Sequence, residues 1–307
     1  MEKRRIGSLE VGLVGLGCNN FGGRLDAARS TAVIHAALDA GITLLDTADV
    51  YGGTASEEII GDALRGRREG VVLATKFGMP LPQGPTGGGA KPDYVRSAVE
   101  ASLRRLKTDR IDLYQLHRPD PATPIGDTLA TLDELVRAGK VREIGCSNFS
   151  AAQLAEAREA SRGARFVSVQ NEYSLLNRDV EREVLPATQA AGLAFLPYFP
   201  LASGLLSGKY KRGEPPPAGA RLAGATTGRF LSDTNLARAE ALAAFAKRKG
   251  HTLLELAFSW LATRPTVASI IAGATSPEQI AANVAAPSWK LDAEALRAVD
   301  VLLAASV

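Results

Sequence analysis

Short apolar runs recur along the chain, and several of them show no alternation with polar residues. VVLATK and VASIIAGA are examples of such continuous runs. A strand that is covered on both faces has this pattern, whereas a strand with one face in water alternates apolar and polar residues. We therefore predict eight buried strands, over Val14–Cys18, Thr43–Ala48, Val71–Lys76, Ile111–His117, Glu143–Asn148, Ser168–Tyr173, Leu193–Pro200 and Ala268–Ala274.

Longer amphipathic segments separate these runs. In Asp93–Leu106, apolar residues recur at spacings of three and four, which indicates one buried face of a helix. Asp127–Ala138 has a similar stripe and is followed by Gly139, a common helix stop. Ala151–Arg162 and Leu236–Gly250 resemble them. Strand–helix alternation repeated eight times predicts a parallel sheet, and eight units is the number that closes a barrel.

The predicted fold is therefore an α/β (β/α)8 TIM barrel formed by a single domain, residues 1–307. An open doubly wound sheet is the competing architecture, but its G-x-G-x-x-G turn is incomplete here because Cys-Asn-Asn follows Gly15-Leu16-Gly17. Arg5–Val14 has the pattern of a short hairpin that would plug the bottom of the barrel. Long Gly- and Pro-rich loops, Gly78–Lys91 and Lys211–Arg229, follow the third and seventh predicted strands.

Composition narrows the functional classes. The 307 residues include 36 Lys and Arg against 33 Asp and Glu, and a net charge of +3 is too small to indicate a nucleic acid or an anionic membrane as partner. The apolar stretch Ala190–Leu206 is broken by prolines and glycines, so no membrane-spanning helix is predicted. Cys18 and Cys146 cannot build a disulfide framework, and no secretory signal is recognisable, so we expect a cytoplasmic location. The three histidines lie far apart, which predicts no metal site.

Four polar residues lie at or just after the ends of three predicted strands: Asp46, Tyr51, Lys76 and His117. Each one alone has an ordinary structural explanation, such as a loop cap or a packed tyrosine. Their convergence on the rim where barrel enzymes do chemistry favours a catalytic centre. A nearby ammonium is expected to lower the pKa of a tyrosine from about 10, so that the phenol can donate a proton to a carbonyl oxygen. A neutral imidazole can donate a second hydrogen bond to that oxygen, and something else must supply electrons.

The chain resembles the aldo-keto reductase superfamily, including its bacterial members and the potassium-channel β subunits, over nearly its whole length. The segments that carry the resemblance are LLDTADVYGGTASEEIIGDAL, VVLATKFG, RIDLYQLHRPDP, GKVREIGCSNFS, VQNEYSLLNR, PYFPLASGLLSGKY and IIAGATSPEQIAAN. The resemblance implies an NADPH-dependent carbonyl reductase with a tetrad of Asp46, Tyr51, Lys76 and His117, in which Tyr51 is the general acid. In such enzymes the cofactor carries the hydride and the protein supplies orientation and electrostatics.

The resemblance also implies a set of cofactor-binding residues. Ser147, Asn148 and Gln170 would hold the nicotinamide carboxamide, with Tyr198 stacked on the ring. The remaining members, which run from the pyrophosphate to the adenosine, would be Gly17, Cys18, Asn19, Asp46, Pro200, Leu201, Ser203, Leu205, Ser207, Lys209, Arg221, Gly273, Thr275, Ser276, Gln279 and Asn283.

Three departures from the family pattern affect the expected cofactor preference. Phe199 stands where many relatives have serine, and Ala282 replaces a glutamate that contacts adenine in relatives. Thr275 and Ser276 stand where some relatives place Arg or Lys against the 2′-phosphate. A preference for NADPH would therefore depend on Lys209 and Arg221, and use of NADH stays open.

The expected substrate is a small carbonyl compound, with aldehydes, ketones and sugar-like carbonyls all open. The residues expected around it are Asn20, Phe21, Tyr51, Phe77 and His117. Because the chain ends soon after the helical pattern Asp292–Leu303, we expect a comparatively open pocket.

Two other functions and the oligomeric state stay open. A Schiff-base aldolase would use Lys76 as its nucleophile, although Asp46 nearby would keep the amine protonated. A redox-sensing partner protein, like the potassium-channel β subunits, would bind the cofactor with negligible turnover. The oligomeric state is undetermined, because barrel helices bury one face with or without a partner.

Overall fold

The structure is a computed structural model that describes residues 1–81, 87–223 and 229–305. Residues 82–86 of the loop Gly78–Lys91 and residues 224–228 of the loop Lys211–Arg229 lie outside the described residues. The strands are β1 Lys3–Ile6, β2 Leu9–Gly12, β3 Val14–Gly17, β4 Leu44–Asp46, β5 Val72–Phe77, β6 Ile111–Leu116, β7 Val141–Ser147, β8 Ser168–Glu172, β9 Ala194–Tyr198 and β10 Ile270–Gly273.

Strands β3 to β10 form a closed barrel in the order β10-β3-β4-β5-β6-β7-β8-β9, and all neighbouring pairs are parallel. The predicted eight-stranded barrel is confirmed, and each strand end lies within two residues of its predicted position. Every residue of β3, β5 and β6 is buried, as continuous apolar runs require when helices cover one face and the barrel core the other.

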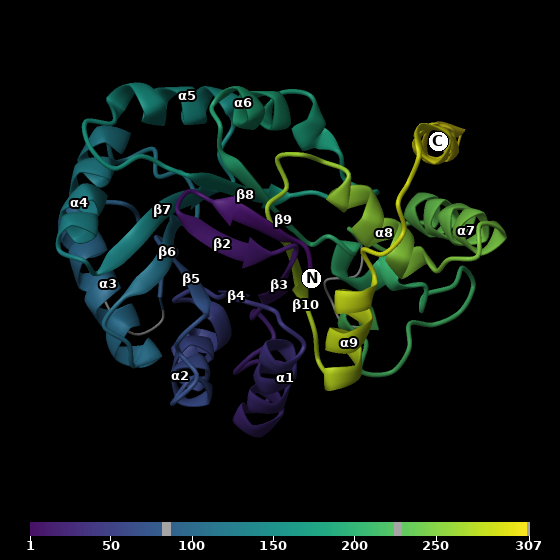
Figure 1. The fold of residues 1–307 in the computed structure, drawn as a ribbon, viewed down its shortest axis with the longest axis horizontal. Coiled ribbons are helices and arrows are strands. Elements are labelled where there is room, and N and C mark those ends of the chain that lie inside the picture. Colours follow the sequence, from purple (N-terminus) through teal and green to yellow (C-terminus); the bar gives the residue numbers. More distant parts are fainter. Residues whose placement is uncertain (82–86, 224–228, 306–307) are drawn as a thin grey trace.

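Helices surround the barrel on the outside, as Figure 1 shows. The α-helices are α1 Ala27–Asp39, α2 Ala55–Ala63, α3 Pro92–Leu106, α4 Ile125–Arg137, α5 Ala151–Ala160, α6 Val184–Ala190, α7 Asp233–Arg248, α8 Leu253–Ala262, α9 Pro277–Ala285 and α10 Ala293–Ala305. Short 3-10 segments are η1 Tyr51–Thr54, η2 Asp179–Glu181, η3 Ala202–Ser207 and η4 Arg221–Ala223. The apolar stripe predicted in α3 is buried, and α10 lies beside α7. None of the helices in the described ranges is long and apolar enough to cross a bilayer.

The hairpin β1–β2 lies across the N-terminal end of the barrel, in front of the strands in Figure 1. Ile6, Leu9 and Val11 form one apolar cluster with inward residues at the start of the strands, among them Leu44 and Leu196. This cluster closes the bottom of the barrel, so the predicted hairpin plug is confirmed.

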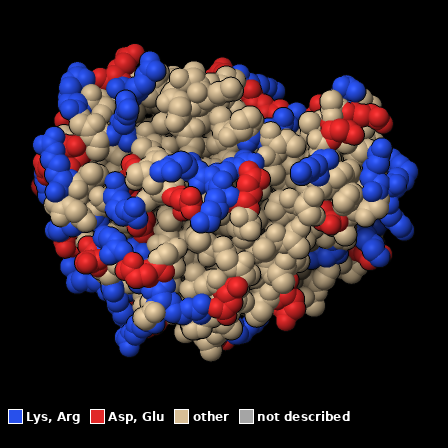
Figure 2. All heavy atoms as spheres, viewed as in Figure 1, with Lys and Arg blue, Asp and Glu red and all other residues tan. Residues whose placement is uncertain are grey.

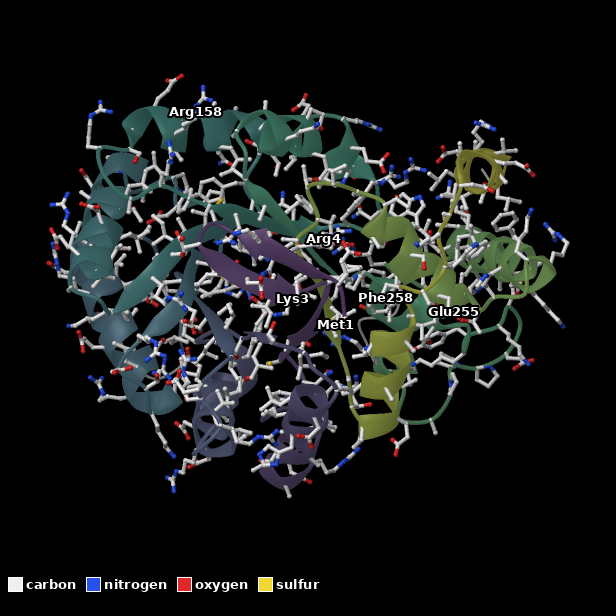
Figure 3. The ribbon with its side chains drawn as sticks, viewed as in Figure 1. Met1, Lys3, Arg4, Arg158, Glu255 and Phe258 are labelled. Carbon is white, nitrogen blue, oxygen red and sulfur yellow. The ribbon has the colours of Figure 1, made fainter. Side chains whose placement is uncertain are left out.

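Arg4 fastens the hairpin to the segment that follows α8. Its guanidinium donates hydrogen bonds to the carbonyl oxygens of Ala262, Arg264 and Val267, and Figure 3 places Arg4 over the middle of this face. Lys and Arg side chains are interspersed with Asp and Glu on the face shown in Figure 2. The N-terminal end of the barrel is therefore filled by apolar packing and by the Arg4 hydrogen bonds. The opposite, C-terminal end is where barrel enzymes place their active sites.

Candidate active site

A cavity of about 750 Å³ opens at the C-terminal ends of the barrel strands. Residues at the ends of β3, β4, β7, β9 and β10 line it, together with the loop that contains η3 and η4. Its volume lies in the upper part of the range typical of small-molecule and cofactor sites.

The buried pair Asp46 and Lys76 forms the floor of the catalytic region. The Nζ atom of Lys76 donates to Oδ2 of Asp46 at 2.6 Å and to the carbonyl oxygen of Thr47 at 2.9 Å. The other carboxylate oxygen of Asp46 accepts from the side-chain amides of Gln115 and Gln170, at 3.0 and 2.9 Å. Lys76 itself does not line the cavity.

Tyr51 begins η1, and a sharp turn follows it. Gly52 has φ +59°, and a Cβ there would lie 2.5 Å from the carbonyl oxygen of Phe21, so the turn requires glycine. Burial raises the pKa of the Tyr51 phenol, while the Lys76 ammonium lowers it. Lys76 thus acts in the expected direction, but the net shift of the pKa is upward, because removing the phenolate from water outweighs the attraction of one ammonium whose charge Asp46 already balances.

His117 lies edge-to-face with Tyr51, with 5.8 Å between the ring centroids. Burial lowers the pKa of His117 to about 3, and the charges of Lys76 and Arg118 add to this. The imidazole is therefore neutral over the physiological pH range. Its Nδ1 atom is buried with no hydrogen-bond partner among the described residues.

The predicted carboxamide-binding residues form one hydrogen-bonded group on the cavity wall. The Ser147 hydroxyl donates to the carbonyl oxygen of Gln170 at 2.7 Å. The Asn148 amide donates to the carbonyl oxygen of His117, and its oxygen accepts from the Tyr198 hydroxyl at 2.8 Å. These bonds fix the orientation of each side chain before any ligand binds.

Backbone strain is concentrated at the rim of the cavity. Asn148, Phe199 and Ser203, which all line it, have φ values of +63°, +50° and +57°. Non-glycine residues rarely adopt this left-handed conformation, and strained positions of this kind cluster at ligand sites.

Most of the predicted cofactor-binding residues line the cavity, but Leu205 and Ser276 do not. Leu205 is fully buried in the core. Ser276 caps α9, where its hydroxyl accepts from the backbone N–H of Gln279. Residues close to them in the chain, Ser207 and Thr275, do line the cavity. The prediction was therefore wrong for Leu205 and Ser276 themselves.

Phe21 and Phe77, which were expected to contact the substrate, do not reach the cavity either. Both are completely buried, and neither lines the cavity; Phe77 stacks on Tyr114, with ring centroids 4.6 Å apart. Asn20 does line the cavity. Both rings belong to the apolar cluster packed between the barrel strands and the surrounding helices, and sequence alone does not show which way such side chains point.

Positive charge dominates the cavity wall. Besides Lys209 and Arg221, three arginines line it that sequence reasoning missed: Arg24, Arg118 and Arg229. For Arg118 a signal existed, because it directly follows His117 at the end of a strand. Arg24 and Arg229 come from loops, where the sequence pattern gives no direction.

Arg221 lies in η4 and bridges two sides of the cavity. Its guanidinium donates to the side-chain oxygens of Asn19 and Asn20, both at 3.2 Å, and lies 5.4 Å from the ring centre of Phe199. The described part of the loop Lys211–Arg229 thus lines the cavity.

A second buried carboxyl lies behind the site. Neither side-chain oxygen of Asp49 has a hydrogen-bond partner among the described residues. Burial raises its pKa to about 7, and the nearby Glu57 carboxylate contributes. Glu57 itself is bound by Thr75 and Arg105.

Within residues 1–81, 87–223 and 229–305, no group of three or more potential ligands could hold a metal ion.

Comparisons with known proteins agree with this geometry. The family model described as the Aldo/keto reductase family matches residues 13–304. The chain is 36% identical over 277 residues to a probable voltage-gated potassium channel subunit beta of Oryza sativa subsp. japonica, covering 87% of this chain and 84% of that protein. It is 35% identical to the aldo-keto reductase YhdN of Bacillus subtilis, covering 96% and 91%.

Solved structures give the same result. A glycerol dehydrogenase from Gluconobacter oxydans superposes with a TM-score of 0.87 at 32% identity, covering 99% of this chain and 96% of that one. An aldo-keto reductase from Bacillus halodurans, solved in its holo form, gives 0.81 at 33% identity, covering 98% and 96%. With matches of this length in both sequence and structure, the chain belongs to the aldo/keto reductase family and is an oxidoreductase.

Proposed function

We propose that the protein reduces an aldehyde or ketone to an alcohol with NADPH and that Tyr51 is the general acid. The observation that carries this proposal is the placement of Tyr51 and His117 on one cavity, with the Lys76–Asp46 ion pair buried behind the phenol. A carbonyl oxygen lying between the phenol and the imidazole could accept a hydrogen bond from each.

The cavity fits a nicotinamide dinucleotide phosphate by its charge. Burial lowers the pKa of both Lys209 and Arg221, and the charge of Arg24 lowers each further, so Arg24 lies within electrostatic reach of both. Three crowded cations without a lining carboxylate beside them favour a bound polyanion. When bound, the dinucleotide would supply the hydride that reduces the carbonyl carbon.

The residues at the other end of the cavity would orient the substrate and move a proton. Because its pKa is raised, the Tyr51 phenol stays protonated and can donate to the oxygen on which negative charge develops. Neutral His117 would donate a second hydrogen bond and stabilise the same charge. The Ser147, Asn148 and Gln170 group would hold the carboxamide in one orientation, since their bonds fix them in advance.

The alternative Schiff-base mechanism is disfavoured by the state of Lys76. Its contact with the Asp46 carboxylate raises the pKa of the ammonium despite burial, so the amine is protonated and cannot act as a nucleophile. The resemblance to a potassium channel β subunit keeps the redox-sensing alternative open, and the rate of turnover distinguishes it from the proposal.

The test is loss of NADPH absorbance with a reactive aromatic aldehyde, in the wild type and in Tyr51→Phe. We expect kcat to fall by about 100-fold or more, because the proton donor is removed. Tyr94→Phe is the matched control: it also removes one phenolic hydroxyl, which contacts the Met79 carbonyl and does not line the cavity.

Equal activity of Tyr51→Phe and the wild type would contradict the assignment of the acid. If neither protein turns over although both bind NADPH, the function moves to the cofactor-sensing alternative. Titrations of the wild type with NADPH and with NADH, followed by cofactor fluorescence, settle the preference between the two.

A further inference from the structure

The charges that line the cavity divide into two groups. Asp46 is the one carboxylate among the described lining residues, and Lys76 neutralises it. Facing it are five Lys and Arg residues. A cofactor with several phosphate groups accounts for the three that lie together, Arg24, Lys209 and Arg221.

The two other cations lie at the end of the cavity where the tetrad is. Both Arg118 and Arg229 interact electrostatically with the Tyr198 phenol, and Arg118 also with His117. Arg229 is already paired with the carboxylate of Glu172. Arg118 has no hydrogen-bond or ion-pair partner in the described part of the chain.

The acidic residue nearest to Arg118 in the sequence does not neutralise it. The carboxylate oxygens of Asp120 accept hydrogen bonds from the backbone N–H groups of Ala90 and Ala122 and from the Thr123 hydroxyl. Asp120 therefore serves to fix the loops that follow β5 and β6. Arg118 is left as an unpaired guanidinium on the wall beside the catalytic imidazole.

We propose that Arg118 binds an anionic group of the substrate, so that the preferred substrates are aldehydes or ketones that also carry a carboxylate or a phosphate. This inference rests on the proposed carbonyl reduction. The planar guanidinium offers paired donors that match a carboxylate or phosphate, and its position one residue after His117 sets the anion near the reacting carbonyl.

The test compares substrates that differ in one anionic group. 4-Carboxybenzaldehyde is paired with its methyl ester, methyl 4-formylbenzoate, which keeps the ring and the aldehyde but is neutral. Succinic semialdehyde and its methyl ester form an aliphatic pair. Glyceraldehyde 3-phosphate and glyceraldehyde test phosphate instead of carboxylate. The readout for each pair is the ratio of kcat/KM for the charged substrate to that for the neutral one.

The wild type is expected to favour the charged member of at least one pair. In Arg118→Gln this ratio is expected to fall by roughly 10- to 100-fold, the usual range for loss of a charge-assisted hydrogen bond. The loss is expected mainly in KM, because Arg118 binds the substrate away from the bond that changes. Arg118→Lys is expected to restore part of the ratio, and more salt to lower the wild-type ratio.

Arg158→Gln is the matched control, since it removes the same charge from an exposed position on α5, away from the cavity (Figure 3). A wild-type ratio near one for all three pairs would overturn the inference while carbonyl reduction stands. The inference would also be overturned if Arg118→Gln lowered kcat/KM equally for the charged and the neutral substrate of each pair. Failure to reduce any of the six compounds with NADPH would instead contradict the proposed function itself.

Discussion

The Nζ atom of Lys76 lies 2.6 Å from Oδ2 of Asp46, and their side chains are 1% and 4% exposed. An ion pair so deeply buried gains little stability over an apolar pair of the same shape, because both charges lose their hydration. In the proposed mechanism, this pair holds a positive charge beside the Tyr51 phenol in a fixed place.

Removing one partner of this pair is expected to be strongly destabilising. Lys76→Met leaves the Asp46 carboxylate buried with two amide donors but no counter-charge, and we expect the free energy of unfolding to fall by about 3–5 kcal/mol. Urea denaturation measures it. Lys107→Met is the control, because it breaks the exposed pair with Asp62, where solvent screens both charges, and should change stability far less. Equal effects of the two variants would contradict the role of burial.

The neutral state of His117 gives a pH prediction. Its pKa in the folded chain is about 3, below that of a free histidine at 6.5. Between these pH values the unfolded chain binds a proton on this imidazole and the folded chain does not. This contribution to stability is complete above about pH 6.5 and is lost as the pH falls toward 3.

Histidine NMR of the labelled protein measures the pKa directly, with His117→Gln to assign the signal. The His117 resonance is expected to stay constant between pH 8 and pH 5. A midpoint near 6.5 for this signal would refute the assignment of a neutral imidazole held by burial.

Asp49 is expected to contribute a pH dependence of stability opposite in sign to that of His117. Its pKa in the folded chain is raised to about 7, so between about pH 4 and 7 the folded chain holds a proton that the unfolded chain has released. Stability from this group is therefore lost as the pH rises. Between pH 5 and pH 9, the free energy of unfolding of the wild type should fall by roughly 3 kcal/mol more than that of Asp49→Asn.

Urea denaturation at the two pH values measures this difference. Asp109→Asn, at an exposed position, is the control and should follow the wild type at both. Parallel behaviour of the wild type and Asp49→Asn would show that the carboxyl is ionised throughout.

Phe199 is expected to position Arg221. The guanidinium lies 5.4 Å from the ring centre of Phe199, and Phe230 packs edge-on against the same ring. Phe199→Ser should therefore weaken NADPH binding by about 2- to 10-fold, through loss of the cation–π contact.

A double-mutant cycle with Arg221→Met tests this coupling. If the two residues act together, Phe199→Ser has little effect once Arg221 is replaced. Additive losses in Kd, measured by cofactor fluorescence, would mean that Phe199 acts on the cofactor independently.

Much of the fold could be predicted because the relevant information is local. Continuous apolar runs reveal strands covered on both faces, and spacings of three and four reveal helices such as α3. The order of these elements then implies a parallel barrel, whose strand ends bring Asp46, Tyr51 and His117 to one rim.

The misplaced residues were those whose direction depends on packing. Phe21 and Phe77 point into the core, and the Ser276 hydroxyl is used by a helix cap. Arg24 and Arg229 reach the cavity from loops, which have no periodicity that could reveal it.

The sequence by itself determined the elements, their order and the chemical groups that collect at the C-terminal rim, because these follow from patterns between near neighbours. The tertiary structure alone decided how much water each group loses. That loss reversed the expected net pKa shift of Tyr51 and raised the pKa of Asp49. Desolvation depends on every segment packed around a group, and those segments are distant in the chain.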